Sequence, residues 1–218
     1  MKKLHSLLNT IPIFELWSRK RKINRLRTRY ELWQGAGAEL PLPHYGKQLV
    51  VAEYGKRFNT SILVETGTYH GHMVMAMLER FSEIYSIELD ATLCSNARSF
   101  FSRHRHVHIV HGASDHVLPQ ILTKVEQPCL FWLDAHYSGG KTAKGDLSTP
   151  IMNELKFILQ HPLSGRHVLL IDDARCFTGD DDYPTLQQVQ ESIWEKHPDW
   201  AFEVRDDIIR AHAPVNTD

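Results

Sequence analysis

Short apolar runs rich in β-branched residues recur along most of this chain, and segments with helical spacing separate them. Between the first two runs, for example, Val74, Met77, Leu78 and Phe81 fall at i, i+3, i+4 and i+7, which is the spacing of one helix face. The apolar runs are SILVETG (61–67), IYSIELD (84–90), VHIVHG (107–112), CLFWLDAH (129–136) and HVLLIDDAR (167–175). The pattern predicts strands that alternate with helices.

Alternation of this kind predicts βαβ units, and right-handed crossovers then give a parallel sheet with helices on both faces. The nearly continuous apolar runs agree, because parallel strands are buried on both sides. Two further runs, AFEVRDD (201–207) and IIRAHAP (208–214), follow each other directly, and so short a join predicts an antiparallel hairpin. We therefore expect an α/β fold: a doubly wound, mostly parallel, seven-stranded sheet that ends in a C-terminal antiparallel hairpin.

The N-terminal part has a different pattern. Residues 5–34 read as mostly helical with a break near Pro12, and the Gly/Pro-rich connector GAGAELPLPHYG (35–46) follows. We expect a basic helical extension at residues 1–47 and one main domain at 48–218. Residues 1–35 contain nine Lys/Arg and two Glu, a net charge of +7, so the other residues sum to −8. Such a basic segment suits contact with an anionic surface, a polyanionic substrate or the acidic remainder, although a solvated helix face is the plainer alternative.

Composition narrows the class of protein. The sequence has no run of about 18–20 apolar residues that would span a membrane, and it shows no signal-peptide cleavage pattern. The three cysteines, Cys94, Cys129 and Cys176, are far apart and odd in number, which favours a reducing compartment over a disulfide framework. We expect a cytoplasmic protein. Nothing requires nucleic acid, and a homo-oligomer is left open.

Polar residues gather where the predicted strands end. In an open α/β sheet the ligand site lies at the carboxyl ends of the strands. Carboxylates at several adjacent strand ends repel one another, and such crowding needs a cation or a positively charged ligand to offset it. The residues at these ends are Glu65 and Gly67, Glu88, Ser114 and Asp115, Asp134 and His136, and Asp172 and Asp173.

The first strand leads into ETGTYHG, in which Gly67 and Gly71 let the backbone approach a ligand closely. This is not the GxGxxG of dinucleotide-binding folds, because Glu65 replaces the first glycine. A carboxylate there repels a pyrophosphate and attracts a cationic ligand. Glu88 follows some twenty residues later, where an acid commonly binds ribose hydroxyls. A plain strand-to-helix turn is the alternative.

On VETGTYHG, SIELD and the strand ends that follow, the sequence resembles the class I S-adenosylmethionine (SAM)-dependent methyltransferases, over residues 48–214. The resemblance implies that Glu65 and Gly67 lie along the methionine and sugar of the cofactor and that Glu88 holds the ribose hydroxyls. It also places Ser114 and Asp115 near the adenine. Tyr69, Gly71 and Asp134 complete the implied cofactor-binding set.

Within that family, a metal-dependent group of O-methyltransferases, of the catechol, macrolide-sugar and cephamycin-cluster types, has one acid after the fourth strand and an acid pair after the fifth. Asp134, Asp172 and Asp173 occupy the matching places, although the relatives often have Glu-Asp or Asp-Asn as the pair. The resemblance implies Mg²⁺, which prefers oxygen ligands. It also suggests His136 as the catalytic base; Lys141, five residues further on, is a second candidate base or oxyanion partner. Each acid alone is also compatible with a helix cap or turn, and His136 with a simple loop hydrogen bond.

The sequence thus predicts a SAM-dependent methyltransferase that methylates a hydroxyl of a small molecule or sugar with the assistance of Mg²⁺. One rival is a non-catalytic, cofactor-binding regulatory protein on the same fold. Another is a different nucleotide-dependent enzyme on a similar sheet, which Glu65 disfavours. The alternating His104, His106 and His108 precede the end of the third strand, so we expect them on a packed or solvated face and not in a metal site.

Overall fold

The structure, a computed structural model, describes residues 13–134 and 149–214. The chain divides into two compact units, residues 1–47 and 48–218. The first unit contains helix α1 (Ile13–Gly35) and the start of α2 (His44–Arg57), which continues into the second unit. In the described part of the chain, no helix has both the length and the apolar character that crossing a bilayer requires.

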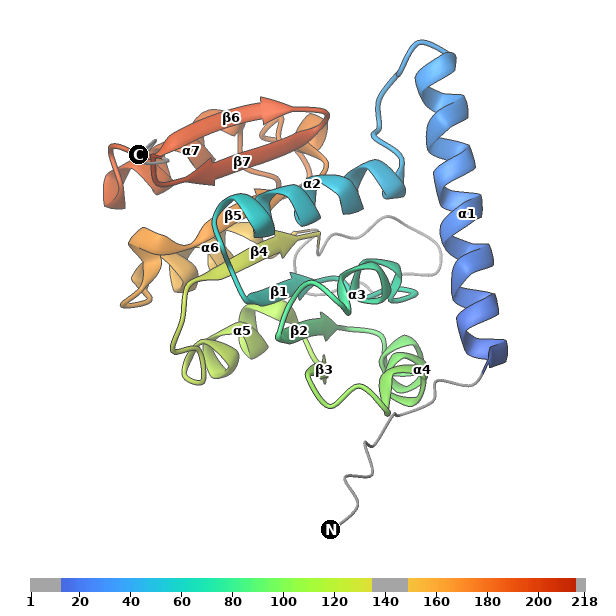
Figure 1. The fold of residues 1–218 in the computed structure, drawn as a ribbon. Coiled ribbons are helices and arrows are strands. Elements are labelled where there is room, and N and C mark those ends of the chain that lie inside the picture. The colour runs from blue at the N-terminus through green and yellow to red at the C-terminus, as the bar shows by residue number, and fades with distance from the viewer. Residues whose placement is uncertain (1–12, 135–148, 215–218) are drawn as a thin grey trace. The chain divides into compact units, whose positions relative to one another are not determined.

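The second unit is built on one seven-stranded sheet (Figure 1). Its strands are β1 (Ile62–Thr66), β2 (Glu83–Glu88), β3 (Val107–His111), β4 (Cys129–Leu133), β5 (Val168–Ile171), β6 (Ala201–Arg205) and β7 (Ile208–His212). Their order in the sheet is β3-β2-β1-β4-β5-β7-β6. The first five strands run parallel, whereas β7 pairs antiparallel with both β5 and β6. The predicted fold class is confirmed.

The helices alternate with the strands as the spacing predicts. They are α3 (His72–Met77), α4 (Ala91–Phe101), α5 (Ser114–Leu122), α6 (Ile151–Gln160) and α7 (Leu186–Lys196), with short 3₁₀ turns η1 (Ser164–Arg166) and η2 (Ala174–Cys176). Helix α3 is shorter than its apolar spacing indicates, because it ends at Met77. Phe81 is also buried, but it lies in the segment after the helix.

The core lies on both faces of the sheet because alternate side chains of each strand point to opposite faces. Val64, Phe131 and Leu169 belong to one apolar cluster with buried residues of α5, α6 and α7. On β7, Ile209 and Ala211 join this cluster, while the next residue, His212, points to the opposite face, where its ring lies 5.7 Å from the Tyr54 ring of α2. Helices α5, α6 and α7 therefore cover one face of the sheet, and Tyr54 of α2 packs against the other.

The histidines of the third strand region bond to close neighbours. His106 Nε2 lies 3.1 Å from the carbonyl oxygen of Leu78, and His108 Nε2 lies 2.7 Å from a carboxylate oxygen of Glu83. β3 is an edge strand of the sheet. Neither histidine belongs to a group of metal-ligating side chains among the described residues.

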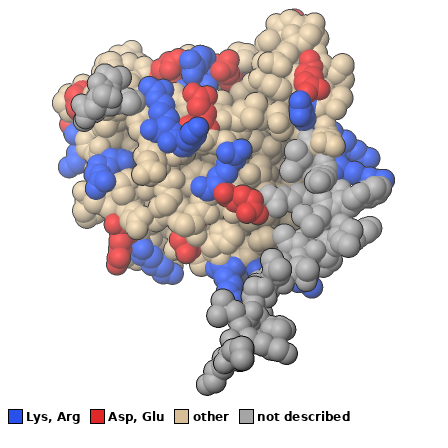
Figure 2. Space-filling model, viewed as in Figure 1, with Lys and Arg blue, Asp and Glu red and all other residues tan. Residues whose placement is uncertain are grey.

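Charge on the outer hairpin is mixed in sign. Arg205 lies 3.4 Å from Glu203 and 3.8 Å from Asp206, and Arg210 lies 3.1 Å from Asp206. Figure 2 shows blue and red atoms intermixed over this region of the surface. The hairpin therefore presents no field of a single sign to solvent on the face shown.

Candidate functional site

The register of the central strands brings three chain segments to one edge of the sheet. Thr66 pairs with Leu133, and Leu133 pairs with Ile171, so β1, β4 and β5 end in one row. The amide of Asp134 donates to the carbonyl of Thr66 at 3.1 Å, and that of Asp172 donates to Leu133 at 3.0 Å. Ordinary ladder bonds, continued one residue past the strands, thus place the two aspartates side by side.

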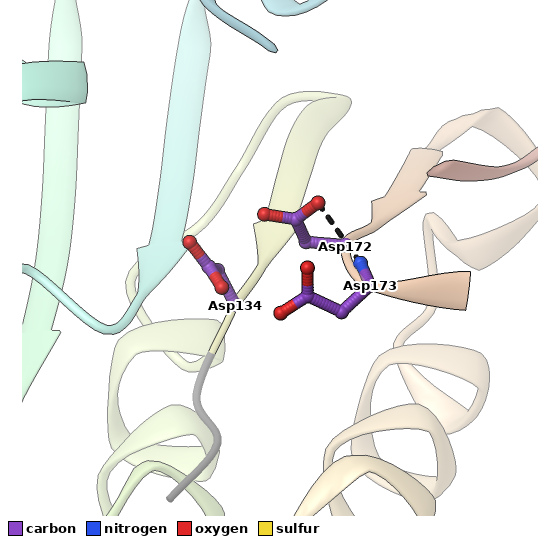
Figure 3. A group of neighbouring side chains, drawn as sticks. All are labelled: Asp134, Asp172 and Asp173. Atoms are coloured by element: carbon purple, nitrogen blue, oxygen red, sulfur yellow. Dashed lines mark hydrogen bonds between the residues drawn. The ribbon is translucent and has the colours of Figure 1, made fainter. Parts of the chain in front are cut away.

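The three predicted metal ligands converge. Asp134, Asp172 and Asp173 each offer a carboxylate oxygen, and these oxygens all lie within 4.8 Å of one another. Figure 3 shows the carboxylates of Asp134 and Asp172 facing one another across the ends of β4 and β5, with that of Asp173 beside them. Oxygen ligands of Mg²⁺ or Ca²⁺ lie about 2.0–2.6 Å from the ion, so a spread of this size is compatible with one shared divalent cation.

Asp173 adopts a backbone conformation that is uncommon for a residue with a side chain. Its φ and ψ are 54° and 47°, in the left-handed region. Its amide donates to Asp172 Oδ1 at 2.9 Å (Figure 3). Strained residues of this kind persist where the surroundings over-determine them, and they cluster at functional sites.

An arginine already pairs with one of the acids. Arg175 Nη1 lies 2.7 Å from Asp173 Oδ1, and it also contacts the buried carboxylate of Asp207. Although partial burial opposes ionisation, Asp173 and Asp207 together raise the pKa of the Arg175 guanidinium. The sequence analysis did not identify Arg175 or Asp207. Arg175 stands two residues after the acid pair, but the partnership with Asp207 leaves no signal in local sequence.

A small pocket opens beside the acidic cluster. Asp134, Asp172, Glu154 and Tyr183 supply polar groups to its wall, and the other lining residues are Leu133, Thr149, Ile151, Ile171 and Phe177. The ring of Phe177 packs edge-on against that of Tyr183 at 5.5 Å. Burial, together with the neighbouring Cys176, Asp173 and Asp134, raises the pKa of the Tyr183 hydroxyl. The pocket is therefore lined by both apolar side chains and acids.

Glu154 is a buried acid that the sequence analysis missed. Its side chain is 1% exposed, and its Oε1 makes no hydrogen bond to any described residue. Burial raises the pKa of Glu154 to about 7, and Asp115 and Asp134 add to the rise, while nearby hydroxyls of Ser114 and Thr66 oppose it. A signal was present: Glu154 interrupts the apolar face that Ile151, Leu155 and Ile158 form on α6.

The turn after β1 has the backbone form that its glycines predict. Gly67, Tyr69 and Gly71 have φ values of 89°, 47° and 67°. A Cβ at Gly71 would lie 2.7 Å from the ring of Phe101, so glycine is required there both for conformation and for space. Tyr69 is 46% exposed, at the edge of this turn.

Glu65 and Glu88 lie on either side of this turn and have different hydrogen-bond partners. Glu88 accepts the Tyr69 amide at 2.7 Å with one carboxylate oxygen and the Asp90 amide at 2.9 Å with the other. Glu65 is 2% exposed and accepts the Ser86 hydroxyl at 2.5 Å. Burial raises the pKa of Glu65 to about 8, with Asp134 and Glu88 adding to the rise and Ser86 opposing it. A cation bound beside Glu65 would lower this pKa again.

The remaining predicted residues divide into two groups. Ser114 begins α5, where it is buried and its Oγ makes no hydrogen bond to a described residue. Asp115 follows it and accepts a hydrogen bond from Asn153 at 3.2 Å. His136 and Lys141, the predicted bases, lie outside the described residues.

No protein-family model matches this sequence, and no match was found among curated proteins. Solved structures do match. The O-methyltransferase from Bacillus cereus in complex with SAH has a TM-score of 0.58 at 14% identity, over 89% of this chain and 90% of that one. The SAH-bound methyltransferase PaMTH1 of Podospora anserina has a TM-score of 0.56 at 16% identity, over 84% and 86%. The SAM complex of the O-methyltransferase TomG from Streptomyces achromogenes has a TM-score of 0.53 at 14% identity, over 87% of this chain and 89% of that one.

These likenesses extend over most of each chain at low identity, so they bear on the fold. The second unit of this protein has the class I, SAM-dependent methyltransferase fold that the sequence resemblance implied. The roles of its individual residues rest on the geometry described above.

Proposed function

We propose that this protein is a SAM-dependent methyltransferase that methylates a hydroxyl group of a small molecule or sugar with the assistance of a divalent cation. The single observation that carries the proposal is the convergence of Asp134, Asp172 and Asp173 at the ends of β4 and β5, on the same sheet edge as the Gly67–Gly71 turn. Fold alone does not determine chemistry, so the site must support the claim.

The donor set fits a hard cation. Three carboxylates offer oxygen ligands, and the unpartnered, buried Glu154 oxygen adds a further acid to the pocket beside them. Asp134, Asp172 and Asp173 would hold the ion, and Mg²⁺ suits them because it prefers oxygen ligands and retains other positions for substrate oxygens. When bound, the ion would supply positive charge that lowers the pKa of the acceptor hydroxyl.

Residues at the ends of β1 and β2 and at the start of α5 would bind SAM. Glu88, fixed by two backbone amides, would accept the ribose hydroxyls, while Glu65, Gly67, Tyr69 and Gly71 would line the methionine and sugar of SAM. Ser114 and Asp115 would lie near the adenine. The Glu65 carboxyl, once ionised, would favour the cationic cofactor over a pyrophosphate, which disfavours the rival of a dinucleotide enzyme.

The chemical step would be an in-line displacement. The acceptor oxygen, having lost its proton to His136 or Lys141, would attack the methyl carbon of SAM. The new C–O bond forms as the C–S bond breaks, and sulfur retains the electron pair to give SAH. Catalysis would come chiefly from positioning and charge stabilisation.

One observation favours the rival of a non-catalytic cofactor-binding protein. The Arg175 guanidinium neutralises part of the charge on Asp173, as expected of a structural ion pair. The other two carboxylates and the pocket beside them favour the enzymatic proposal. Cytoplasmic location, contact of the basic N-terminal segment with an anionic surface, absence of nucleic-acid binding and self-association stay predictions.

Two binding measurements test the proposal without a known acceptor. SAH at about a hundred times its Kd stabilises a folded protein by about 2.7 kcal/mol, which should raise the Tm by at least about 5 °C. Mn²⁺, as a probe of the cation site, should bind the wild type, and Asp134→Asn should weaken this binding on the order of a hundredfold while leaving the SAH shift largely intact. Asp199→Asn, an exposed change of the same kind, is the control.

The outcomes separate the two parts of the proposal. Absence of any melting shift with millimolar SAH would remove the cofactor. Equal Mn²⁺ binding by the wild type and the Asp134→Asn variant would remove the metal centre and favour the non-catalytic rival.

A further inference from the structure

The turn between β6 and β7 contains a buried acid in a position where acids are usually exposed. Arg205 pairs with Ile208, so Asp206 and Asp207 form a two-residue hairpin loop, and both have positive φ, 53° and 64°. Asp207 is nevertheless 4% exposed. A carboxylate that is buried at a loop tip needs partners, and the partners identify what the turn contacts.

Asp207 accepts hydrogen bonds from the segment directly after the acid pair. Its carbonyl accepts the Ala174 amide at 2.9 Å, and its Oδ1 accepts the Arg175 amide at 2.8 Å. Its Oδ2 accepts the Arg175 guanidinium, whose Nη1 also donates to Asp173 Oδ1 at 2.7 Å. The hairpin turn is therefore bonded to the chain within two residues of Asp173.

The hydrogen bonds of Asp207 fix the chain next to Asp173, whose backbone conformation is strained. The left-handed backbone of Asp173 is unfavourable for a residue with a Cβ, so the residues after it must be fixed for it to persist. Asp207 fixes Ala174 and Arg175 through their amides. Through the guanidinium it also shares Arg175 with Asp173, so that the positive charge is divided between two carboxylates.

We propose that Asp207 is a positioning residue for the acidic cluster: by holding Arg175 it orients the Asp173 carboxylate toward Asp134 and Asp172 and sets the affinity of the cluster for a divalent cation. The inference rests on the proposed function. Without the Asp207 charge, Arg175 would pair more fully with Asp173 and compete with the cation. The fixed backbone around Asp173 would loosen as well, and both changes weaken cation binding.

The two adjacent turn residues provide a matched experiment. Asn tolerates positive φ, and its Oδ1 can still accept the Arg175 amide, so Asp207→Asn removes chiefly the ion pair. Asp206→Asn makes the same change one residue earlier, where the carboxylate pairs with Arg205 and Arg210 instead. With Mn²⁺ as the probe and free Mn²⁺ measured by electron paramagnetic resonance, we expect Asp207→Asn to bind about 10–100-fold more weakly, and Asp206→Asn to stay within about twofold of wild type.

A second variant tests whether Asp207 acts through the guanidinium. In an Arg175→Gln background, Asp207→Asn should cause almost no additional loss of Mn²⁺ affinity, because the group that it releases is absent. If Asp207→Asn does not fold by circular dichroism, Arg175→Lys replaces it. Lysine keeps the charge but replaces the planar guanidinium with a compact, strongly hydrated ammonium on a different stem, so this variant should also bind Mn²⁺ several-fold more weakly.

If Asp207→Asn binds Mn²⁺ as tightly as the wild type, the positioning role is wrong. It is also wrong if Asp207→Asn lowers the Mn²⁺ affinity as much in the Arg175→Gln background as in the wild type. Either result would leave the proposed metal centre intact. Failure of the wild type itself to bind Mn²⁺ would overturn both, while the SAH measurement tests the cofactor independently.

Discussion

At the scale of single residues, burial raises the pKa values of two acids among the described residues into or above the neutral range. Burial raises the pKa of Glu65 to about 8 and that of Glu154 to about 7. Unfolding returns each carboxyl to water and to a pKa near its ordinary value, so folding is linked to proton uptake. The stability that this linkage contributes is fully present below the unfolded pKa and is lost as pH rises through the folded value.

The linkage predicts an alkaline loss of stability that Glu65→Gln should reduce. For Glu65 alone, the free energy of unfolding should fall on the order of 3 kcal/mol between about pH 6 and about pH 9. Glutamine keeps an acceptor for Ser86 but has no proton to lose, so its curve should be flatter. Urea denaturation of the wild type and of Glu65→Gln at a series of pH values measures the difference. Glu195→Gln, an exposed acid of α7, should follow the wild type, and parallel curves for Glu65→Gln would contradict the linkage.

At the scale of elements, the turn between β1 and α3 combines a required conformation with a close contact. Gly71 has a φ of 67°, and the Phe101 ring of α4 lies where a Cβ would be. The glycine thus lets two neighbouring helices approach while the chain turns away from the sheet edge.

Gly71→Ala should therefore destabilise the protein by about 2–4 kcal/mol, through the left-handed backbone and the overlap with Phe101 together. Chemical denaturation measures the change, and SAH binding should weaken because the turn is displaced. Gly165→Ala is the matched control, since the added Cβ would meet only an ordinary contact at 3.5 Å from His197. A Gly71→Ala protein as stable as the wild type would show that the turn relaxes freely.

The strands and their polar ends could be predicted because the signals are local. A run such as CLFWL needs burial on two faces, and parallel neighbours then place Asp134 beside Asp172 with no further information. Arg175 and Asp207 could not be paired from sequence, because 32 residues separate them and the contact depends on how a hairpin folds back. The length of α3 was overestimated since Phe81 continues the apolar spacing beyond the last helical turn.

At the scale of the whole molecule, the complete sheet lies within one compact unit. All seven strands fall between residues 62 and 212, inside the unit of residues 48–218. The basic N-terminal segment contributes no strand among the described residues. Its net charge of +7 is opposite in sign to the −8 of the remainder, so we expect it to affect association more than the core.

Deletion of residues 1–35 should accordingly leave a cooperative unfolding transition, with a Tm within about 5 °C of the full chain. Association, measured by size-exclusion chromatography at low and high salt, should change more than the Tm, because exposed charges are screened by salt. Collapse to an unfolded or aggregated chain would show that the segment belongs to the fold of the main unit.

The bonds from Asp134 to Thr66 and from Asp172 to Leu133 have a consequence for divergence among related proteins. Both use backbone atoms on the strand side of the carboxylates, so neither depends on which amino acids occupy positions 135–148. Mutations and length changes there can accumulate without moving the acids. Under the proposed function, a lineage that keeps His136 and Lys141 could therefore vary the other residues of this segment while the acidic cluster keeps its place.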